Sequence, residues 1–210
     1  MIDLPYTDRW KILSKLVSDE GLTPRIISSD AEKVESFMRS ALKEGHEGLM
    51  AKSLSSNYTI GARGKKWFKI KPSDKLDVVI VAADWGSGRR VGWLSNYHLA
   101  VKDEETGEFI VVGKTFKGLT DAEFETITKQ LQELKIRDGR YTVYVKPIVV
   151  AEVAYNEIQK SPRYKSGFAL RFARITRLRE DKRPDDADTL QRMRKLYDKQ
   201  FENKARYVSE

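Results

Sequence analysis

Acidic and basic side chains that could bind a polyphosphate lie close together between residues 47 and 71. Lys69 and Lys71 alternate with two apolar residues, and on a β-strand this period of two places both ammonium groups on one face. The acid of the segment, Glu47, suits either a ligand of a divalent metal or a plain exposed carboxylate. The same pattern also fits an ordinary amphipathic strand with a solvated lysine face. The further cations of the segment are Lys52, Arg63, Lys65 and Lys66.

A second basic run covers residues 171–183. A guanidinium group can hold two phosphate oxygens at once, so arginines interleaved with apolar residues indicate an anion-binding strand. Charged residues of this kind also protect strand edges from aggregation, and that interpretation stays open. The arginines of the run are Arg171, Arg174, Arg177, Arg179 and Arg183.

The composition of the 210 residues favours an anionic partner, because 39 Lys and Arg stand against 31 Asp and Glu, a net charge of +8. Nucleic acid comes before a membrane surface, although abundant Lys and Glu can also serve thermal stability alone. The absence of Cys excludes disulfides and thiol chemistry, and two His argue against a His-rich metal site. With no signal-peptide pattern and no apolar run of ~20 residues, we expect a soluble protein of the cytoplasm, or of the nucleus in a eukaryote.

The elements that must position the first cations alternate between helix and strand. Apolar spacing predicts a helix over 9–19, with Thr7 or Asp8 as its cap, and a second helix that starts at a Ser29–Glu32 capping box and ends at Gly45. Short strands are expected at 22–28, 47–54 and 66–71, with a polar loop at 55–65.

After residues 72–75 the pattern changes to short strands around one helix. Strands are expected at 76–83, 93–101 and 109–114, a helix at 120–135 capped by Thr120 and Glu123, and β-rich stretches at 141–154 and 168–178. A last helix is expected at 185–201. The strands with their inserted helix favour a small closed barrel of the OB-fold type.

Three segments in this order and spacing resemble motifs IV, V and VI of the ATP-dependent DNA ligases. They are Glu47-Gly48-Leu49-Met50-Ala51-Lys52, Lys66-Trp67-Phe68-Lys69-Ile70-Lys71, and the stretch from Arg171-Phe172 to Arg179-Glu180-Asp181-Lys182. Residues 113–121 are similar to the segment that precedes the helix of the ligase OB domain. The resemblance covers nearly the whole chain and is strongest to the archaeal and eukaryotic replicative type.

The resemblance implies an α+β architecture. Residues 1–73 would be the rear half of a nucleotidyltransferase (adenylation) domain of mixed sheet and helices, and residues 74–210 an OB-fold barrel with a C-terminal helix. It implies ATP and Mg²⁺ as cofactors, nicked duplex DNA as substrate and a sliding clamp as a further partner. The enzyme would adenylate a lysine, pass AMP to the 5′-phosphate at a nick, and join the strand by attack of the 3′-hydroxyl.

The resemblance also implies a role for each matched residue. Glu47 would help to place the metal. Arg179, Asp181 and Lys182 would close over ATP and orient its leaving pyrophosphate. The remaining cations would contact the nucleotide, with Lys69 near its α-phosphate: Lys52, Arg63, Lys69 and Lys71.

One part of the ligase pattern is absent from the 210 residues, namely the nucleophilic lysine of a Lys-x-Asp-Gly motif. Lys135-Ile136-Arg137-Asp138-Gly139 has one residue too many and lies after motif V, so we reject it. We therefore expect the chain to start just after motif III, to expose apolar surface in its first half, and not to self-adenylate alone. Two alternatives remain, a related RNA ligase or capping guanylyltransferase and a stand-alone OB-fold module that binds nucleic acid.

Overall fold

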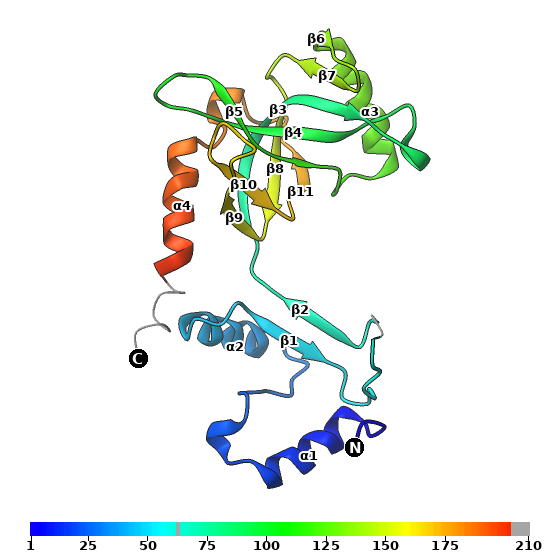
Figure 1. Ribbon diagram of the computed structural model, residues 1–210, viewed down its shortest axis with the longest axis vertical. Helices are drawn as coiled ribbons and strands as arrows, with labels where there is room; N and C mark the ends of the chain where they lie inside the picture. Colours follow the sequence, from blue (N-terminus) through cyan, green and yellow to red (C-terminus); the bar gives the residue numbers. More distant parts are fainter. Residues whose placement is uncertain (62–63, 203–210) are drawn as a thin grey trace. The chain divides into compact units, whose positions relative to one another are not determined.

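The computed structural model describes residues 1–61 and 64–202, and these divide into two compact units (Figure 1). Unit 1 is Met1–Pro72, and unit 2 begins at Ser73. The last strand of unit 1 ends at Ile70 and the first strand of unit 2 begins at Asp74, and the two strands belong to different sheets. None of the described helices is both long enough and apolar enough to cross a membrane.

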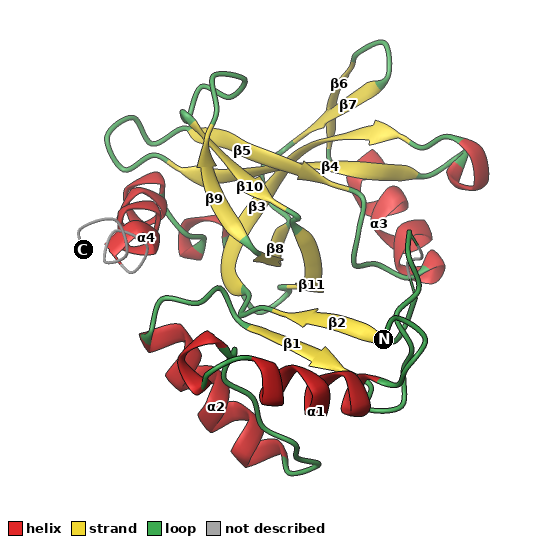
Figure 2. Ribbon diagram, turned by 60° about the horizontal axis from the view of Figure 1, so that its bottom comes forward, coloured by secondary structure: helices red, strands yellow, loops and turns green. Residues whose placement is uncertain are grey.

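Unit 1 consists of two helices and one antiparallel strand pair (Figure 2). Its elements are α1 (Tyr6–Leu16), a 3-10 turn (Asp19–Gly21), α2 (Ala31–Lys43), β1 (Leu49–Lys52) and β2 (Trp67–Ile70). A mixed sheet was expected in this half of the chain, and among the described residues it is represented by the antiparallel pair β1–β2. The prediction of a strand at 22–28 was wrong. This segment pairs with no other described strand, and a β-strand is defined by its hydrogen bonds to a neighbouring strand.

Both helix starts of unit 1 differ from the expected ones. α1 begins after Pro5 without a side-chain cap, and the hydroxyl of Thr7 donates instead to the carbonyl of Leu54 at 3.1 Å. α2 is capped by Asp30 rather than Ser29, because the Asp30 carboxylate accepts the backbone N–H groups of Glu32 (2.9 Å) and Lys33 (3.3 Å). An ionised acceptor at the positive end of a helix is the stronger cap.

Apolar side chains of unit 1 are mostly left in contact with solvent. Ala41 is the single buried apolar residue among those described, whereas Ile27, Leu16, Phe68 and Ile60 are all more than half exposed. An apolar surface of this extent usually marks a face that another segment covers. The expectation of exposed apolar surface in the first half is confirmed.

Unit 2 is built around one curved antiparallel sheet with strand order β11-β8-β3-β4-β5 (Figure 2). Its strands are β3 (Asp74–Trp85), β4 (Leu94–Lys102), β5 (Phe109–Thr115), β6 (Lys135–Asp138), β7 (Thr142–Val145), β8 (Val150–Tyr155), β9 (Glu157–Lys160), β10 (Phe168–Arg171) and β11 (Arg174–Leu178). Its helices are α3 (Asp121–Glu133) and α4 (Leu190–Glu202), with 3-10 turns at Gly88–Arg90 and Pro184–Asp186.

The sheet closes on itself where the chain leaves β5 and meets β11. The backbone N–H of Ile175 donates to the carbonyl of Lys117 at 2.9 Å, and the hydroxyl of Thr115 donates to the carbonyl of Ala173 at 2.6 Å. Gly118 makes this closure possible: its φ is +110°, and a Cβ there would lie 1.8 Å from the Ile175 carbonyl oxygen. The resulting ring β3-β4-β5-β11-β8 confirms the closed barrel of the OB-fold type.

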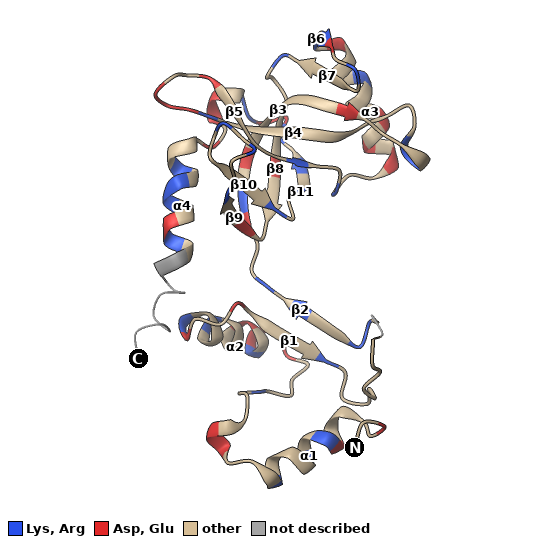
Figure 3. Ribbon diagram, viewed as in Figure 1, with Lys and Arg blue, Asp and Glu red and all other residues tan. Residues whose placement is uncertain are grey.

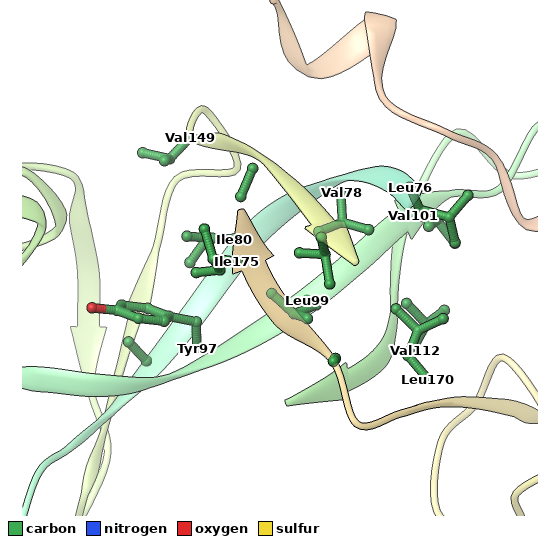
Figure 4. Close-up of a cluster of buried hydrophobic side chains, with 14 of the residues drawn as sticks. Leu76, Val78, Ile80, Tyr97, Leu99, Val101, Val112, Val149, Leu170 and Ile175 are labelled. Atoms are coloured by element: carbon green, nitrogen blue, oxygen red, sulfur yellow. The ribbon is translucent and has the colours of Figure 1, made fainter. Parts of the chain in front are cut away.

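The barrel interior holds the hydrophobic core, to which alternate residues of β3 and β4 contribute (Figure 4). The largest contributions from β3 and β4 are Leu76, Val78, Ile80, Tyr97, Leu99 and Val101. α3 adds Phe124, Ile127 and Leu131, behind the predicted capping box of Thr120 and Glu123, which is confirmed. α4 begins five residues later than expected, because Pro184–Asp186 forms a separate turn.

Candidate functional site

In unit 1, the register of β1 with β2 places the predicted nucleotide-binding cations on one face. Lys52 lies opposite Trp67, and Lys69 lies opposite Met50. Directly opposed residues of an antiparallel pair share a face, and so do residues two apart on one strand. Lys52 and Lys69 therefore lie on the same side of the pair. Arg63 lies outside the described residues.

Glu47 and Lys71 form an ion pair at the end of this strand pair. Gly48 permits the approach, since its φ is +142° and a Cβ there would lie 2.2 Å from the carbonyl oxygen of Ile70. The predicted metal ligand and one of the predicted phosphate-binding lysines are thus brought together. No group of three metal-ligating side chains occurs among the described residues.

Aromatic rings surround Lys52, which the sequence did not indicate. The Lys52 ammonium lies 4.4 Å from the ring centre of Trp67 and 5.0 Å from that of Tyr6. Arg25 lies 4.3 Å from the ring centre of Trp10 in the same unit. The alternation of side chains along β2 places Trp67 on the same face as Lys69, and this could be predicted from the sequence. Tyr6 lies on α1, so its contact with Lys52 could be seen only in the folded structure. Cation–π contacts of this kind fix the position of an ammonium group without neutralising it.

A hollow of about 700 Å³ lies beside these residues within unit 1. It is lined by α1, α2, β1 and the extended segment at 22–28, and its apolar lining includes Leu13, Phe37 and Met50. The hollow therefore belongs to the exposed apolar side of unit 1.

In unit 2, Arg179 lies between two carboxylates. Its Nε and Nη2 donate to the two carboxylate oxygens of Asp181 at 2.8 and 2.7 Å, and its Nη1 donates to Asp77 at 3.1 Å. The guanidinium is only 12% exposed. The paired guanidinium lowers the pKa of the Asp181 carboxyl well below its ordinary value, and the same hydrogen bonds raise the pKa of Arg179.

Lys182 joins the same group through Asp77, so the three predicted residues meet. The Lys182 ammonium donates to Asp77 Oδ2 at 2.6 Å. We call Asp77, Arg179, Asp181 and Lys182 the Asp77 cluster. Sequence reasoning missed Asp77, which lies 102 positions before Arg179 in the chain.

The other basic residues of the 171–183 run do not enter the Asp77 cluster. Arg171, Arg174 and Arg177 are exposed on β10 and β11. Phe172, between these strands, is 63% exposed and has a φ of 54°, which is unusual for a residue with a side chain. Lys135 of the rejected near miss lies on β6 and pairs with Asp138 at 2.9 Å.

Two family models match adjacent parts of the chain. Residues 1–71 match the ATP dependent DNA ligase domain, and residues 90–182 match the ATP dependent DNA ligase C terminal region. The two matches fall on unit 1 and unit 2, respectively.

Curated relatives are similar over nearly the whole chain. DNA ligase 1 of Korarchaeum cryptofilum is 54% identical over 198 residues, which are 94% of this chain and 37% of that protein. DNA ligase of Thermococcus fumicolans is 47% identical over 210 residues, 98% of this chain and 38% of that protein. The Probable DNA ligase of Anaeromyxobacter sp. (strain K) is 48% identical over 94% of this chain and 39% of its own length. The chain thus spans less than two fifths of the length of these relatives.

Solved structures show the same fold. The structure named Pmar-Lig_Pre has a TM-score of 0.54 at 22% identity, over 71% of this chain and 30% of that one. A structure from the Lig E DNA ligases has a TM-score of 0.50 at 16% identity, over 85% of this chain and 60% of that one. With both family models matched in order and close relatives along its length, the chain belongs to the ATP-dependent DNA ligase family.

Proposed function

We propose that this chain is the nucleotide-binding and OB-fold portion of an ATP-dependent DNA ligase that seals nicks in duplex DNA. Residues 1–73 form the rear of the adenylation domain, and residues 74–210 form the OB domain. The observation that carries the proposal is the Asp77 cluster, because Arg179 and Lys182 of the motif VI pattern both bind one carboxylate that lies 102 and 105 positions before them in the chain. The order of the two family matches supports the same conclusion.

In this proposal the cations of unit 1 bind the phosphates of ATP. Lys69 contacts the α-phosphate, where negative charge builds during attack, and fixed cations stabilise that charge. Lys52, Arg63 and Lys71 bind the rest of the nucleotide. Glu47 would hold Mg²⁺, which supplies further charge stabilisation at the phosphates. Arg179, Asp181 and Lys182 orient the leaving pyrophosphate.

The nucleophile has to come from a segment that precedes these residues in the full protein. The 210 residues contain no Lys-x-Asp-Gly, and the exposed apolar side of unit 1 supports packing against such a segment. The isolated chain is therefore inactive by itself. A stand-alone OB-fold module accounts for the barrel and the charge, but it leaves the match over residues 1–71 without a purpose.

The proposed partner is nicked duplex DNA, in keeping with the net charge of +8. A sliding clamp remains an expectation from the resemblance.

Nick sealing in a complemented mixture tests the proposal. The chain is mixed with the upstream part of a relative's adenylation domain, which carries the Lys-x-Asp-Gly lysine, together with ATP, Mg²⁺ and nicked duplex DNA. Sealing is expected only when both polypeptides are present. If the mixture binds nicked DNA and ATP but never seals it, the proposed function is wrong.

A further inference from the structure

Asp77 is the point at which the two cations of its cluster meet. Its carboxylate accepts Arg179 Nη1 at 3.1 and 3.3 Å and Lys182 Nζ at 2.6 Å. The side chain is only 15% exposed. Both oxygens of the carboxylate accept hydrogen bonds from these two cations. Charge-assisted hydrogen bonds in a partly buried place hold the two cations in defined positions.

The backbone of Asp77 is fixed on both sides. Asp77 is paired with Glu152 in the β3–β8 ladder. Its N–H donates to Asp188 Oδ2 at 2.8 Å, and its carbonyl accepts the N–H of Asp188 at 2.8 Å. Arg179 and Lys182 follow β11, which ends at Leu178. The backbone N–H of Arg179 still donates to the carbonyl of Val150 on β8 at 2.8 Å, whereas that of Lys182 donates to the carbonyl of Arg179 at 3.2 Å. The Asp77 carboxylate therefore ties the side chains of both residues to the barrel strand β3.

The two carboxylates on Arg179 act from different parts of the chain. Asp181 lies two residues after Arg179 in the chain, so it fixes the plane of the guanidinium only relative to this segment. Asp77 alone of the two lies on a barrel strand. Glu152 on the neighbouring strand β8 is a more distant partner, because its Oε2 lies 4.0 Å from Arg179 Nη1.

We propose that Asp77 is a positioning residue for adenylation, which holds Arg179 and Lys182 where they orient the leaving pyrophosphate. This inference rests on the proposed function. Asp77 does not touch the reacting atoms; it acts through the two cations.

The same carboxylate competes with phosphate oxygens for those cations, which gives the proposal a distinctive signature. Replacing Asp77 by Asn removes one negative charge, so a polyanion should bind the chain more tightly. The cations would nevertheless lose their fixed geometry, and a misplaced group slows a reaction even when binding is strong. Tighter binding with slower adenylation is a split that loss of folding cannot produce.

The test compares Asp77→Asn with Asp84→Asn. Asp84 lies on the same strand, is 20% exposed and is likewise hydrogen-bonded by several side chains, but it is outside the cluster. Four quantities are measured: tripolyphosphate affinity of the chain, labelled AMP transfer in the complemented mixture, sealing of a pre-adenylated nick without ATP, and melting temperature. The pre-adenylated nick already carries AMP on its 5′-phosphate, so its sealing does not use the leaving pyrophosphate.

For Asp77→Asn we expect tripolyphosphate affinity to rise about threefold, AMP transfer to fall about tenfold or more, and sealing of the pre-adenylated nick to stay within about twofold of the wild type. Asp84→Asn should lower the melting temperature without this split. AMP transfer at the wild-type rate in Asp77→Asn overturns the proposal, and so does an equal loss of AMP transfer and sealing.

Asp77→Glu gives a second variant in case Asp77→Asn folds poorly. It keeps the charge but displaces the carboxylate, so tripolyphosphate affinity should not change while AMP transfer falls. Full AMP transfer in this variant would contradict a positioning role. A wild-type mixture that transfers no AMP and seals no nick would instead refute the proposed function, and the two failures are therefore distinguishable.

Discussion

Three of the cations that we assign to phosphate binding already pair with a carboxylate in the protein alone: Lys71, Arg179 and Lys182. Arg179 pairs with Asp181, and Lys71 pairs with Glu47. The Lys71 pair is exposed and contributes little to stability, whereas Arg179 is largely enclosed. In the proposed function, phosphate oxygens of ATP would share or replace these partners. Lys69 differs, because it has a neighbouring Met50 and no ion pair among the described contacts.

Removing one phosphate-binding cation should slow adenylation strongly. Lys69→Ala and Arg179→Ala are each expected to lower the rate of labelled AMP transfer in the complemented mixture by roughly 10²-fold, the scale for losing one preorganised charge contact. Lys129→Ala is the control, since Lys129 pairs with Glu125 on the exposed side of α3. A loss of less than about twofold in either variant would contradict the assigned role.

We expect a partly buried polar network around Asp84 to make the barrel sensitive to acid. Burial raises the pKa of Asp84, but hydrogen bonds from its neighbours outweigh burial and lower this pKa to about 2. Those neighbours are Thr142, Lys114 and His98. Because the folded-state pKa is lowered, the stabilisation is present above the ordinary value of 3.8 and is lost as the pH falls toward 2.

Asp84→Asn should therefore destabilise unit 2 in a pH-dependent way. The free energy of unfolding is expected to fall by about 2 kcal/mol at pH 7, and the difference from the wild type should shrink as the pH drops below about 4. Urea unfolding at several pH values measures it, with exposed Asp198→Asn on α4 as control. A difference that stays constant down to about pH 3 would be inconsistent with the lowered pKa.

At the level of elements, closure of the barrel includes a close backbone approach at Gly118. The chain passes so close to Ile175 there that a side chain has no room. This closure joins β5 to β11 and so fixes the start of the strand that leads into the Asp77 cluster. A disturbance at Gly118 would therefore reach the functional residues through β11.

Gly118→Ala and Gly107→Ala separate this contact from the cost of backbone conformation. Both glycines have a positive φ, but a Cβ at Gly107 meets nothing within 4 Å. We expect Gly107→Ala to cost about 1 kcal/mol of unfolding free energy, and Gly118→Ala about 3 kcal/mol or more. Thermal and urea unfolding of the two variants provide the comparison. Equal costs would show that the approach to Ile175 does not limit the barrel.

The sequence predicted the elements whose signal is local. Alternation identified β2, strand-like runs between turn residues identified β3 to β5, and the Thr120–Glu123 pair identified the start of α3. The segment at 22–28 has the residues of a strand but no described partner, and partner strands cannot be read from one segment. Asp77 and Tyr6 were missed for a related reason, since their contacts with Lys182 and Lys52 join positions that are far apart in the chain.

At the scale of the whole chain, the two units differ in how completely they bury their apolar residues. Unit 2 has a closed barrel with an interior core, whereas unit 1 has one buried apolar residue among those described. Stability of the chain alone should therefore come mainly from unit 2. Lys and Arg are distributed over β11, α4 and the loops of unit 2 (Figure 3).

The chain should bind DNA through charge rather than through base recognition. We expect weak binding to nicked or intact duplex, with an affinity that falls on the order of tenfold or more between ~50 and ~200 mM salt because bound protein releases condensed counterions. Fluorescence anisotropy with labelled duplex measures the affinity at both concentrations. Absent binding at low salt, or an affinity that does not respond to salt, would argue against a DNA-binding barrel.

Covalent labelling with ATP tests the central claim, that this chain is one part of a divided adenylation site. The chain is incubated with Mg²⁺ and ATP labelled at its α-phosphate, alone and with the upstream lysine-bearing segment of a relative, and the polypeptides are separated under denaturing conditions. We predict no label on the chain alone, because nucleophilic catalysis needs an amine placed at the α-phosphate and Lys69 and Lys71 serve to stabilise charge there. In the mixture, label should appear on the supplied segment. A stable AMP adduct on this chain itself would contradict the account.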